Sequence, residues 1–594
     1  RALQSGGPLR FVPAGVFIYF VLSAGWPFSV LMLALVSGWL LVRPSEARRW
    51  PVFAAWAMGI GLSAPAWLML LEYARTTVRG HVPLGHVSYG LQVPVSALPG
   101  FVFPAFITSW SLFEGWKPHL SVELAGGLVP IVILLALKRR RGWTSLYAVR
   151  WEAGLAALVL LLAIYPGLGT FRWSFRWLPL FFLLLALVAA HALAALRRFA
   201  TQQQPSLGLW SLAITLPCWL VALALGRDPS ATTWHYGLFV CGLSLAWAAL
   251  DYCAAPTSLP RRWMPVFFVW LTQGFLFAQA PAFLEAQTWD ATALDRQSLD
   301  PDRRYLSVHT WPDIVAEDNQ AVVQPRRGTN AALFPGNFGM YCGLQFLNGY
   351  SPLQPAGLTQ LFGFEIHGTL DRDSAENLLT RDTAPGGLLD LFGIHGLIVA
   401  DRFQSMDSEL RRNGWQRMAT VEGGTVYHRT GATRSVVFTC EKVQWTNDRA
   451  AVAADLMERT ANAAPRMLLA PAGASRPTAR CFAAAQVEAV RESRNAVTAF
   501  VSNADAEREA LVVVARPWLP GYRARLDGQL LPVETLNLVL PAVRVPPRSS
   551  GTLVMEYWPE SLTWGLRAAT LTGLGVALCI VFSLVRRSAP VAEA

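Results

Sequence analysis

The chain has 594 residues, of which 53% are hydrophobic and only 15% are charged, and its mean hydropathy is +0.34. Because soluble domains carry about 25% charged residues, this composition excludes an ordinary soluble protein and indicates membrane spans joined to a soluble part. The formal net charge of +11 would suit a nucleic-acid-binding protein, but the placement of the basic residues along the chain argues against that class.

Apolar runs that are long enough, or nearly long enough, to cross a bilayer as helices recur along the chain. They lie at about 11–24, 27–42, 52–71, 121–137, 151–167, 177–196, 207–225, 234–250, 263–283 and 562–585. When the connection 43–50 is placed in the cytoplasm and the sides alternate, the basic clusters at 138–141 and 586–587 also face the cytoplasm. The positive-inside rule therefore supports this threading and explains the basic charge without nucleic acid.

The same threading predicts the domain organisation. Residues 1–283 form a multi-span helical membrane domain with a long outward loop at 72–120. Residues 284–561 form an extracytoplasmic domain, and residues 562–594 form a last membrane helix with a short cytoplasmic tail. We expect a multi-pass protein of a bacterial cytoplasmic membrane, with its large domain on the outer side.

The extracytoplasmic region has the pattern of a mostly-β domain. Between residues 496 and 558, short runs alternate apolar and polar side chains, and Asp527–Gly528 between two such runs is a hairpin signal. A helical stretch near 374–379 and strand-like runs such as 397–400 precede these residues. The predicted fold class is a polytopic α-helical membrane domain plus an α+β, β-sandwich-like domain.

The cysteines give no metal-site pattern. The seven residues show no CxxC pair and no Cys/His cluster at zinc spacing. Cys342, Cys440 and Cys481 lie in the predicted outer domain, where an oxidising compartment would permit one disulfide. A Cys440–Cys481 bond and two free buried thiols are both compatible with the sequence. The sequence predicts no definite cofactor and leaves open the involvement of a divalent cation.

Two arginines mark the entrance of the apolar run 177–196. Arg172 and Arg176 are four residues apart and alternate with aromatic residues, including Trp173. In a helix this spacing would put both guanidinium groups on one face, where they could hold an anionic lipid head group. The alternative is that both arginines and the tryptophan only anchor the helix at the interface.

A second basic pair stands at the outer end of another predicted span. Arg75 and Arg79 repeat the spacing of four, and Glu72 precedes Arg75 by three residues. These residues would form a second wall of a phosphate site, or only an intrahelical ion pair at an exposed helix end. In the long loop, Trp110 and Glu114 would contact a sugar by stacking and hydrogen bonding, or only anchor the loop.

Several blocks of the chain resemble the bacterial YfhO-like family of polytopic membrane proteins, which belongs to the GT-C class of glycosyltransferases. The blocks are LSAPAWLMLLEYARTTVRG at 62–80, the stretch YPGLGTFRWSFRWLPL at 165–180, FLNGYSPLQP at 346–355 with GLLDLFGIHGLIV at 387–399, and WLPGYRARLDGQLLPV at 518–533. None of these blocks is a catalytic signature. The resemblance covers nearly the whole chain, and the order and spacing of the blocks make it specific.

The resemblance implies transfer of a sugar from a polyprenyl-phosphate-linked donor to a cell-envelope glycan or teichoic-acid-type acceptor at the outer membrane face. It also implies an acidic general base in the first outward loop. Because the chain begins with Arg1 and not with Met, we expect that this loop lies upstream of residue 1. The alternatives are a non-catalytic envelope scaffold that binds glycan, and a transporter or flippase of lipid-linked sugars.

Overall fold

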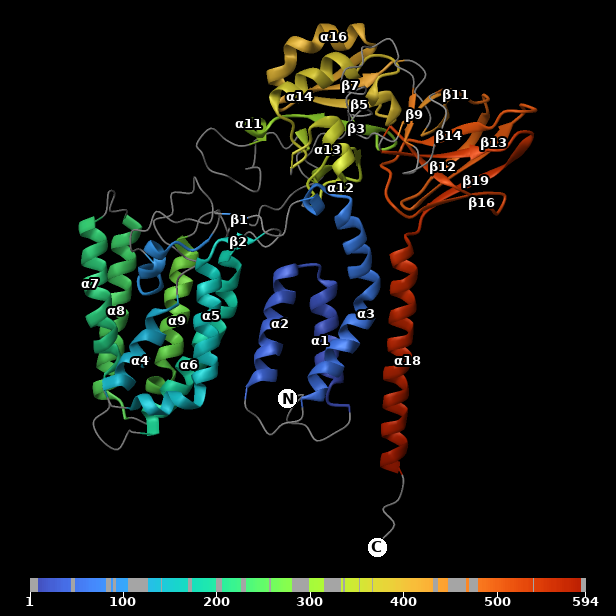
Figure 1. The fold of residues 1–594 in the computed structure, drawn as a ribbon. Coiled ribbons are helices and arrows are strands. Elements are labelled where there is room, and N and C mark those ends of the chain that lie inside the picture. The colour runs from blue at the N-terminus through green and yellow to red at the C-terminus, as the bar shows by residue number, and fades with distance from the viewer. Residues whose placement is uncertain are drawn as a thin grey trace. The chain divides into compact units, whose positions relative to one another are not determined.

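A computed structural model gives the fold of the chain (Figure 1). It describes residues 9–588 except 44–48, 82–86, 89–91, 105–125, 140–141, 169–173, 199–205, 226–230, 256–257, 280–298, 315–332, 335–336, 352, 366, 431–435, 447–465, 470–478 and 538. The chain divides into two compact units, which are described separately. The first comprises Arg1–Trp56 and Val82–Thr288, and the second comprises Ala57–His81 and Trp289–Ala594.

Every predicted apolar run coincides with a helix in the described part of the chain. The helices are α1 (Val12–Ser23), α2 (Pro27–Val42), α3 (Trp50–Arg75), α4 (Leu128–Arg139), α5 (Arg150–Ile164), α6 (Leu178–Arg198), α7 (Leu207–Leu225), α8 (Ala231–Cys253), α9 (Leu259–Gln279) and α18 (Glu560–Ser588). Among the described residues, six helices are long and apolar enough to cross a membrane. The predicted fold class, a polytopic helical membrane domain with mostly-β sheets, is confirmed.

Helices α4–α9 of the first unit pack as a bundle (Figure 1). The core shared by α4 and α6–α9 includes the fully buried Val132, Val240 and Trp247. At the α7–α8 contact, a Cβ on Gly208 would lie only 2.1 Å from the backbone nitrogen of Ala248. Glycine therefore lets the two backbones approach closely, as is usual where apolar surroundings give no hydrophobic drive for association.

Polar contacts connect the ends of α7, α8 and α9 in this unit. Asp251 on α8 accepts hydrogen bonds from the Ser206 hydroxyl and the Gly208 backbone N–H, both at 3.1 Å. It also pairs with Arg261 at 3.3 Å. Because the Gly208 N–H belongs to the first turn of α7, the carboxylate caps that helix where its dipole favours negative charge.

The second unit contains a five-stranded mixed sheet with the order β4-β3-β5-β7-β6. Its strands are β3 (Arg304–Val308), β4 (Gln345–Phe346), β5 (Gly396–Ala400), β6 (Trp415–Val421) and β7 (Gly424–Arg429). The helices around it are α11 (Trp311–Ile314), α12 (Phe338–Tyr341), α13 (Ala356–Phe362), α14 (Arg372–Asn377), α15 (Leu388–Leu391) and α16 (Asp407–Arg412). Strand β3 pairs in parallel with both β4 and β5.

The remaining strands of the second unit form two further sheets that share an aliphatic core, and we refer to these two sheets as the sandwich. One sheet has the order β11-β9-β10-β17-β18-β14-β8 and the other β12-β13-β19-β15-β16. Their bounds are β8 (Val437–Thr439), β9 (Lys442–Thr446), β10 (Arg466–Leu469), β11 (Ala479–Cys481), β12 (Gln486–Glu492), β13 (Ala496–Asn503), β14 (Ala510–Val514), β15 (Tyr522–Leu526), β16 (Gln529–Leu531), β17 (Val533–Leu536), β18 (Leu540–Val545) and β19 (Ser549–Tyr557). The predicted hairpin is confirmed, since Asp527 and Gly528 have φ of 44° and 86° and join β15 to β16.

The described cysteines of the second unit form no disulfide bond. Cys342 and Cys440 are buried, whereas Cys481 is exposed. The Cys440–Cys481 disulfide is therefore absent, and the alternative of two buried thiols fails for Cys481. The strand register explains this, because Cys481 on β11 lies opposite Lys442 on β9, two residues beyond Cys440.

The C-terminal part of α3 belongs to the second unit and packs against α18. A Cβ on Gly61 would lie 2.1 Å from the Thr572 hydroxyl oxygen, and a Cβ on Gly565 would lie 2.6 Å from Cα of Pro65. Since residue numbers rise along α3 while they fall along α18, the two helices run antiparallel. Small residues therefore allow the two membrane helices of this unit to approach closely.

Substitution at this contact should separate the two helices. Gly565→Leu is expected to lower the free energy of unfolding of the second unit by about 1–3 kcal/mol, because the new side chain meets backbone atoms that cannot rotate away. Denaturant unfolding of the full chain in detergent measures the change. Gly573→Leu on the same helix is the matched control, since nothing lies within 4 Å of a Cβ there. Equal losses for both variants would contradict the proposed contact.

Candidate functional site

At the entrance to α6, the partly buried side chain of Arg176 lies among aromatic rings. A 3-10 turn, η5 (Ser174–Trp177), leads directly into the helix. The guanidinium carbon of Arg176 lies 5.5 Å from the ring centroid of Phe28 and 5.8 Å from that of Trp26, at the start of α2. Phe28 in turn contacts Trp177 edge-on at 6.0 Å. Each cation–π contact of this kind contributes about 0.5–2 kcal/mol and fixes the direction of the arginine.

Part of the long loop folds back over the same end of the bundle. Strand β1 (Val87–Ser88) pairs antiparallel with β2 (Gly167–Leu168), which follows α5. The Val93 backbone N–H donates to the carbonyl oxygen of Ala163 at 3.0 Å. The loop segment is thereby tied to the connection between α5 and α6, a few residues before Arg176.

A 3-10 helix, η2 (Val95–Phe101), continues this cover. Val93 and Ala97 are fully buried in a cluster with residues of α5 and α6. Phe101 packs against Phe181 and Phe182 of α6, with ring centroids 5.3 and 5.6 Å apart. This part of the loop, from Val93 to Phe101, therefore forms an apolar layer on the α5–α6 end.

The structure describes only some of the residues that the sequence singles out. Arg172, Trp173, Trp110 and Glu114 lie outside the described residues. The expected face shared by Arg172 and Arg176 therefore stays a prediction, and the described part of that turn, Ser174–Trp177, is a 3-10 turn. The aromatic walls of Arg176 also come from α2, a segment about 150 residues earlier, which no local spacing rule relates to this turn.

The second predicted group of charges belongs to the second unit. Arg75 is exposed at the last residue of α3, and Arg79 lies in the following 3-10 turn, η1 (Val78–His81). Glu72 accepts a hydrogen bond from the Ser561 backbone N–H at 3.3 Å, in the first turn of α18. Because a carboxylate stabilises a helix N-terminus, this contact gives Glu72 a structural role at the α3–α18 junction.

The first resemblance block is anchored to the third. The Tyr73 hydroxyl donates to the carbonyl oxygen of Leu353 at 2.9 Å, and the Val78 N–H donates to that of Gln354 at 3.0 Å. The Ala356 N–H donates to the carbonyl oxygen of Thr76, also at 3.0 Å. The end of α3 is thus bound to the segment between β4 and α13, so two blocks far apart in sequence form one junction.

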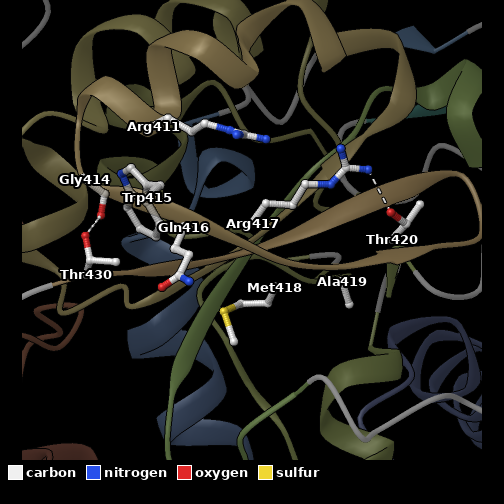
Figure 2. Close-up of a pocket in the computed structure, with 9 residues that line it drawn as sticks. All are labelled: Arg411, Gly414, Trp415, Gln416, Arg417, Met418, Ala419, Thr420 and Thr430. Atoms are coloured by element: carbon white, nitrogen blue, oxygen red, sulfur yellow. Dashed lines mark hydrogen bonds between the residues drawn. The ribbon is translucent and has the colours of Figure 1, made fainter.

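A hollow of about 720 Å³ lies on the outer side of β6, the edge strand of the mixed sheet (Figure 2). Figure 2 shows Arg411 of α16 and Arg417 of β6 along it. Arg411 pairs with Asp407 at 2.9 Å, and Arg417 donates to the Thr420 hydroxyl at 2.8 Å. The guanidinium groups are therefore engaged locally, and no sequence-predicted site residue lines the hollow.

Comparison with known proteins gives one distant likeness. No family model matches the chain, and no curated protein matches it. Among solved structures, the chain is similar to the arabinofuranosyltransferase AftD from Mycobacteria, determined by single-particle cryo-EM, with a TM-score of 0.34 and 12% sequence identity. The match covers 93% of this chain and 44% of that chain, so this chain spans less than half the length of AftD. The fold assignment rests on the helices and sheets described above.

Proposed function

We propose that the protein is a membrane glycosyltransferase of the GT-C type. It transfers a sugar from a polyprenyl-phosphate-linked donor to a cell-envelope glycan or teichoic-acid-type acceptor. The reaction takes place at the outer face of a bacterial cytoplasmic membrane, as the resemblance to the YfhO-like family implies. The resemblance to the YfhO-like family suggests this assignment, and the entrance to α6 supplies its chemistry.

The observation that carries the proposal is the setting of Arg176. A cation held over Phe28 and Trp26 at the entrance of a membrane helix is well placed for the phosphate of a lipid whose chain lies in the bilayer. A guanidinium group can bind phosphate oxygens bidentately and can stabilise the charge that develops on a leaving phosphate. Arg172, four residues earlier, would supply the second cation of this clamp.

The ordered cover formed by β1, β2 and η2 adds to this picture. A glycosyl transfer from a lipid phosphate must exclude water, because water competes with the acceptor hydroxyl. The apolar layer around Val93, Ala97 and Phe101 lies on the same α5–α6 end as the arginine turn. We assign it the role of shielding the donor phosphate, with the acceptor reaching the site from the soluble side.

The clamp is tested by binding of polyprenyl phosphate to the full chain in nanodiscs. The double variant Arg172→Ala with Arg176→Ala should bind the lipid at least about tenfold more weakly, because two charge-assisted contacts to the phosphate are lost. Arg262→Ala, an exposed arginine at the start of α9, is the matched control and should leave the affinity unchanged. Unchanged affinity in a folded double variant would contradict the clamp and indicate that both arginines only anchor the helix at the membrane interface.

A turnover assay separates the transferase from its alternatives. Release of polyprenyl phosphate from a polyprenyl-phosphate sugar in the presence of an acceptor oligosaccharide supports the enzyme. Lipid binding without any release favours an envelope scaffold, and movement of the intact lipid-linked sugar across a vesicle bilayer favours a flippase.

A further inference from the structure

The mixed sheet has a topological switch point. The chain passes from β3 to β4 on one side and then to β5 on the other, and all three strands are parallel. The connection that leaves the carboxyl end of β3 runs to β4, whereas the connection that leaves the carboxyl end of its neighbour β5 runs to β6, on the opposite side. In open α/β sheets, ligands bind at the carboxyl ends of the strands where this reversal occurs.

Three aromatic rings gather at this edge. Trp311 follows β3, Tyr350 follows β4, and His367 comes from the turn after α13. The centroid of the His367 ring lies 4.7 Å from that of Trp311 and 5.2 Å from that of Tyr350. Trp311 is 37% exposed and Tyr350 is 39% exposed, so both rings keep free surface. We refer to these three residues as the aromatic platform.

Trp311 is held in place by polar contacts that its neighbours make. Asp313 accepts hydrogen bonds from the Thr310 backbone N–H at 2.7 Å and from the Thr310 hydroxyl at 2.8 Å. Asp313 also pairs with Arg402, which follows β5. The turn that carries the tryptophan is thus capped and linked across the switch point to the third parallel strand.

The side chain of Asn348 acts as a clamp that joins the turn carrying Tyr350 to the turn carrying His367. The Asn348 side chain donates to the carbonyl oxygens of Ser307 and Gly368, both at 2.8 Å. Gly368 has φ of 75°, and a Cβ on it would lie 2.7 Å from the Gly349 nitrogen. The two turns therefore touch backbone to backbone, which brings the neighbouring rings into stacking distance.

We propose that the aromatic platform is a binding site for a neutral saccharide. Exposed aromatic faces stack on the apolar C–H face of a sugar ring, and polar groups at the rim bind its hydroxyls. Two charged residues near the platform already have polar partners. Arg402 pairs with Asp313, two residues after Trp311. Glu365, two residues before His367, accepts from the Thr369 hydroxyl. With these local charges satisfied, an uncharged sugar fits better than an anionic one.

The place of the platform in the fold suits a membrane-associated glycan. Tyr350 stands three residues before Leu353, whose carbonyl oxygen accepts from Tyr73 at the end of α3. The platform therefore lies beside the junction between the soluble sheets and a membrane-spanning helix. Binding there needs no catalysis, so this inference does not rest on the proposed transferase.

The test uses saturation-transfer NMR on the full chain in nanodiscs, with arabinan, mannan, galactan and glucan oligosaccharides as probes. At least one probe should bind the wild type, and Trp311→Ala combined with Tyr350→Ala should raise its dissociation constant about tenfold. Phe500→Ala is the matched control, since this sandwich residue is 42% exposed and lies outside the platform. Arg176→Ala should also leave saccharide binding unchanged.

Two outcomes would overturn the proposal. One is that no probe binds the wild type, and the other is that the double variant binds as the wild type does. Trp311→Phe, which keeps an aromatic face, should restore most of the binding. If Trp311→Phe has wild-type thermal stability and yet loses all binding, stacking at this residue is not the source of affinity.

Discussion

Replacing Arg304 with alanine should lower the free energy of unfolding of the second unit by about 3–5 kcal/mol. Arg304 begins β3, and its guanidinium group donates to the carbonyl oxygens of Phe392 at 2.7 Å and Ala515 at 2.5 Å. It also pairs with Glu492 at 3.0 Å. Because Ala515 and Glu492 belong to the sandwich, this side chain joins the mixed sheet to the two other sheets.

The cost arises from what the substitution leaves behind. The Arg304 side chain is only 13% exposed, and burial lowers its pKa while Glu492 opposes that change. Without it, two carbonyl oxygens lose a donor, and Glu492 retains only Arg516 as an ionic partner among the described residues. Arg304→Lys should give an intermediate loss, because an ammonium group cannot span these acceptors as a planar fork does.

Urea unfolding of the full chain in detergent measures this effect, with hydrogen exchange of β3 and β12 as the readout for each sheet. Arg303→Ala is the matched control, since its pair with Asp300 is 34% and 43% exposed and should contribute less than about 1 kcal/mol. A loss for Arg304→Ala that is no larger than the control would show that the sheets are held together by other contacts. Destabilised exchange in β3 alone would contradict the joining role.

The sequence predicts the local features well, because local rules govern them. Apolar length sets the helices, and the Asp527–Gly528 pair sets a hairpin because both residues adopt positive φ. The parallel order β4-β3-β5 is less accessible, since β4 has only two residues and the intervening segments are long. Parallel pairing depends on contacts between distant segments, which periodicity along one segment does not report.

The candidate sites show the same limit. Arg176 is visible in the sequence as a cation at a span entrance, but its aromatic partners Trp26 and Phe28 lie on another helix. Trp311 could have been singled out, because it follows a short buried strand that ends before a polar turn. Its partners on the aromatic platform could not, since the clamp by Asn348 acts between turns that are 20 residues apart.

Lowering the pH from 7 to about 4 should destabilise the second unit partly through one histidine. His309, which follows β3 and precedes Trp311 in the sequence, is fully buried. Burial lowers its pKa to about 4 despite the opposing charge of Asp313. Its Nδ1 lies 3.0 Å from the Ser307 hydroxyl, whereas Nε2 has no hydrogen-bond partner among the described residues. The folded state therefore contains the neutral ring.

The sign follows from the two protonation states. Below its ordinary pKa of about 6.5, the histidine of the unfolded chain binds a proton that the folded chain excludes. The stability due to the neutral ring is fully present above that pH and is lost as the pH falls toward 4, by about 3 kcal/mol. His309→Gln, which does not titrate, should remove this part of the pH dependence.

The comparison requires stability curves of the wild type and two variants over the same pH range. His367→Gln is the control, since this half-buried ring should account for a smaller part of the acid sensitivity. If His309→Gln shows the full acid sensitivity of the wild type, the ring is not held neutral by burial. Because His309 leads into the turn that carries Trp311, saccharide binding at the aromatic platform should weaken over the same pH interval in the wild type and less in the variant.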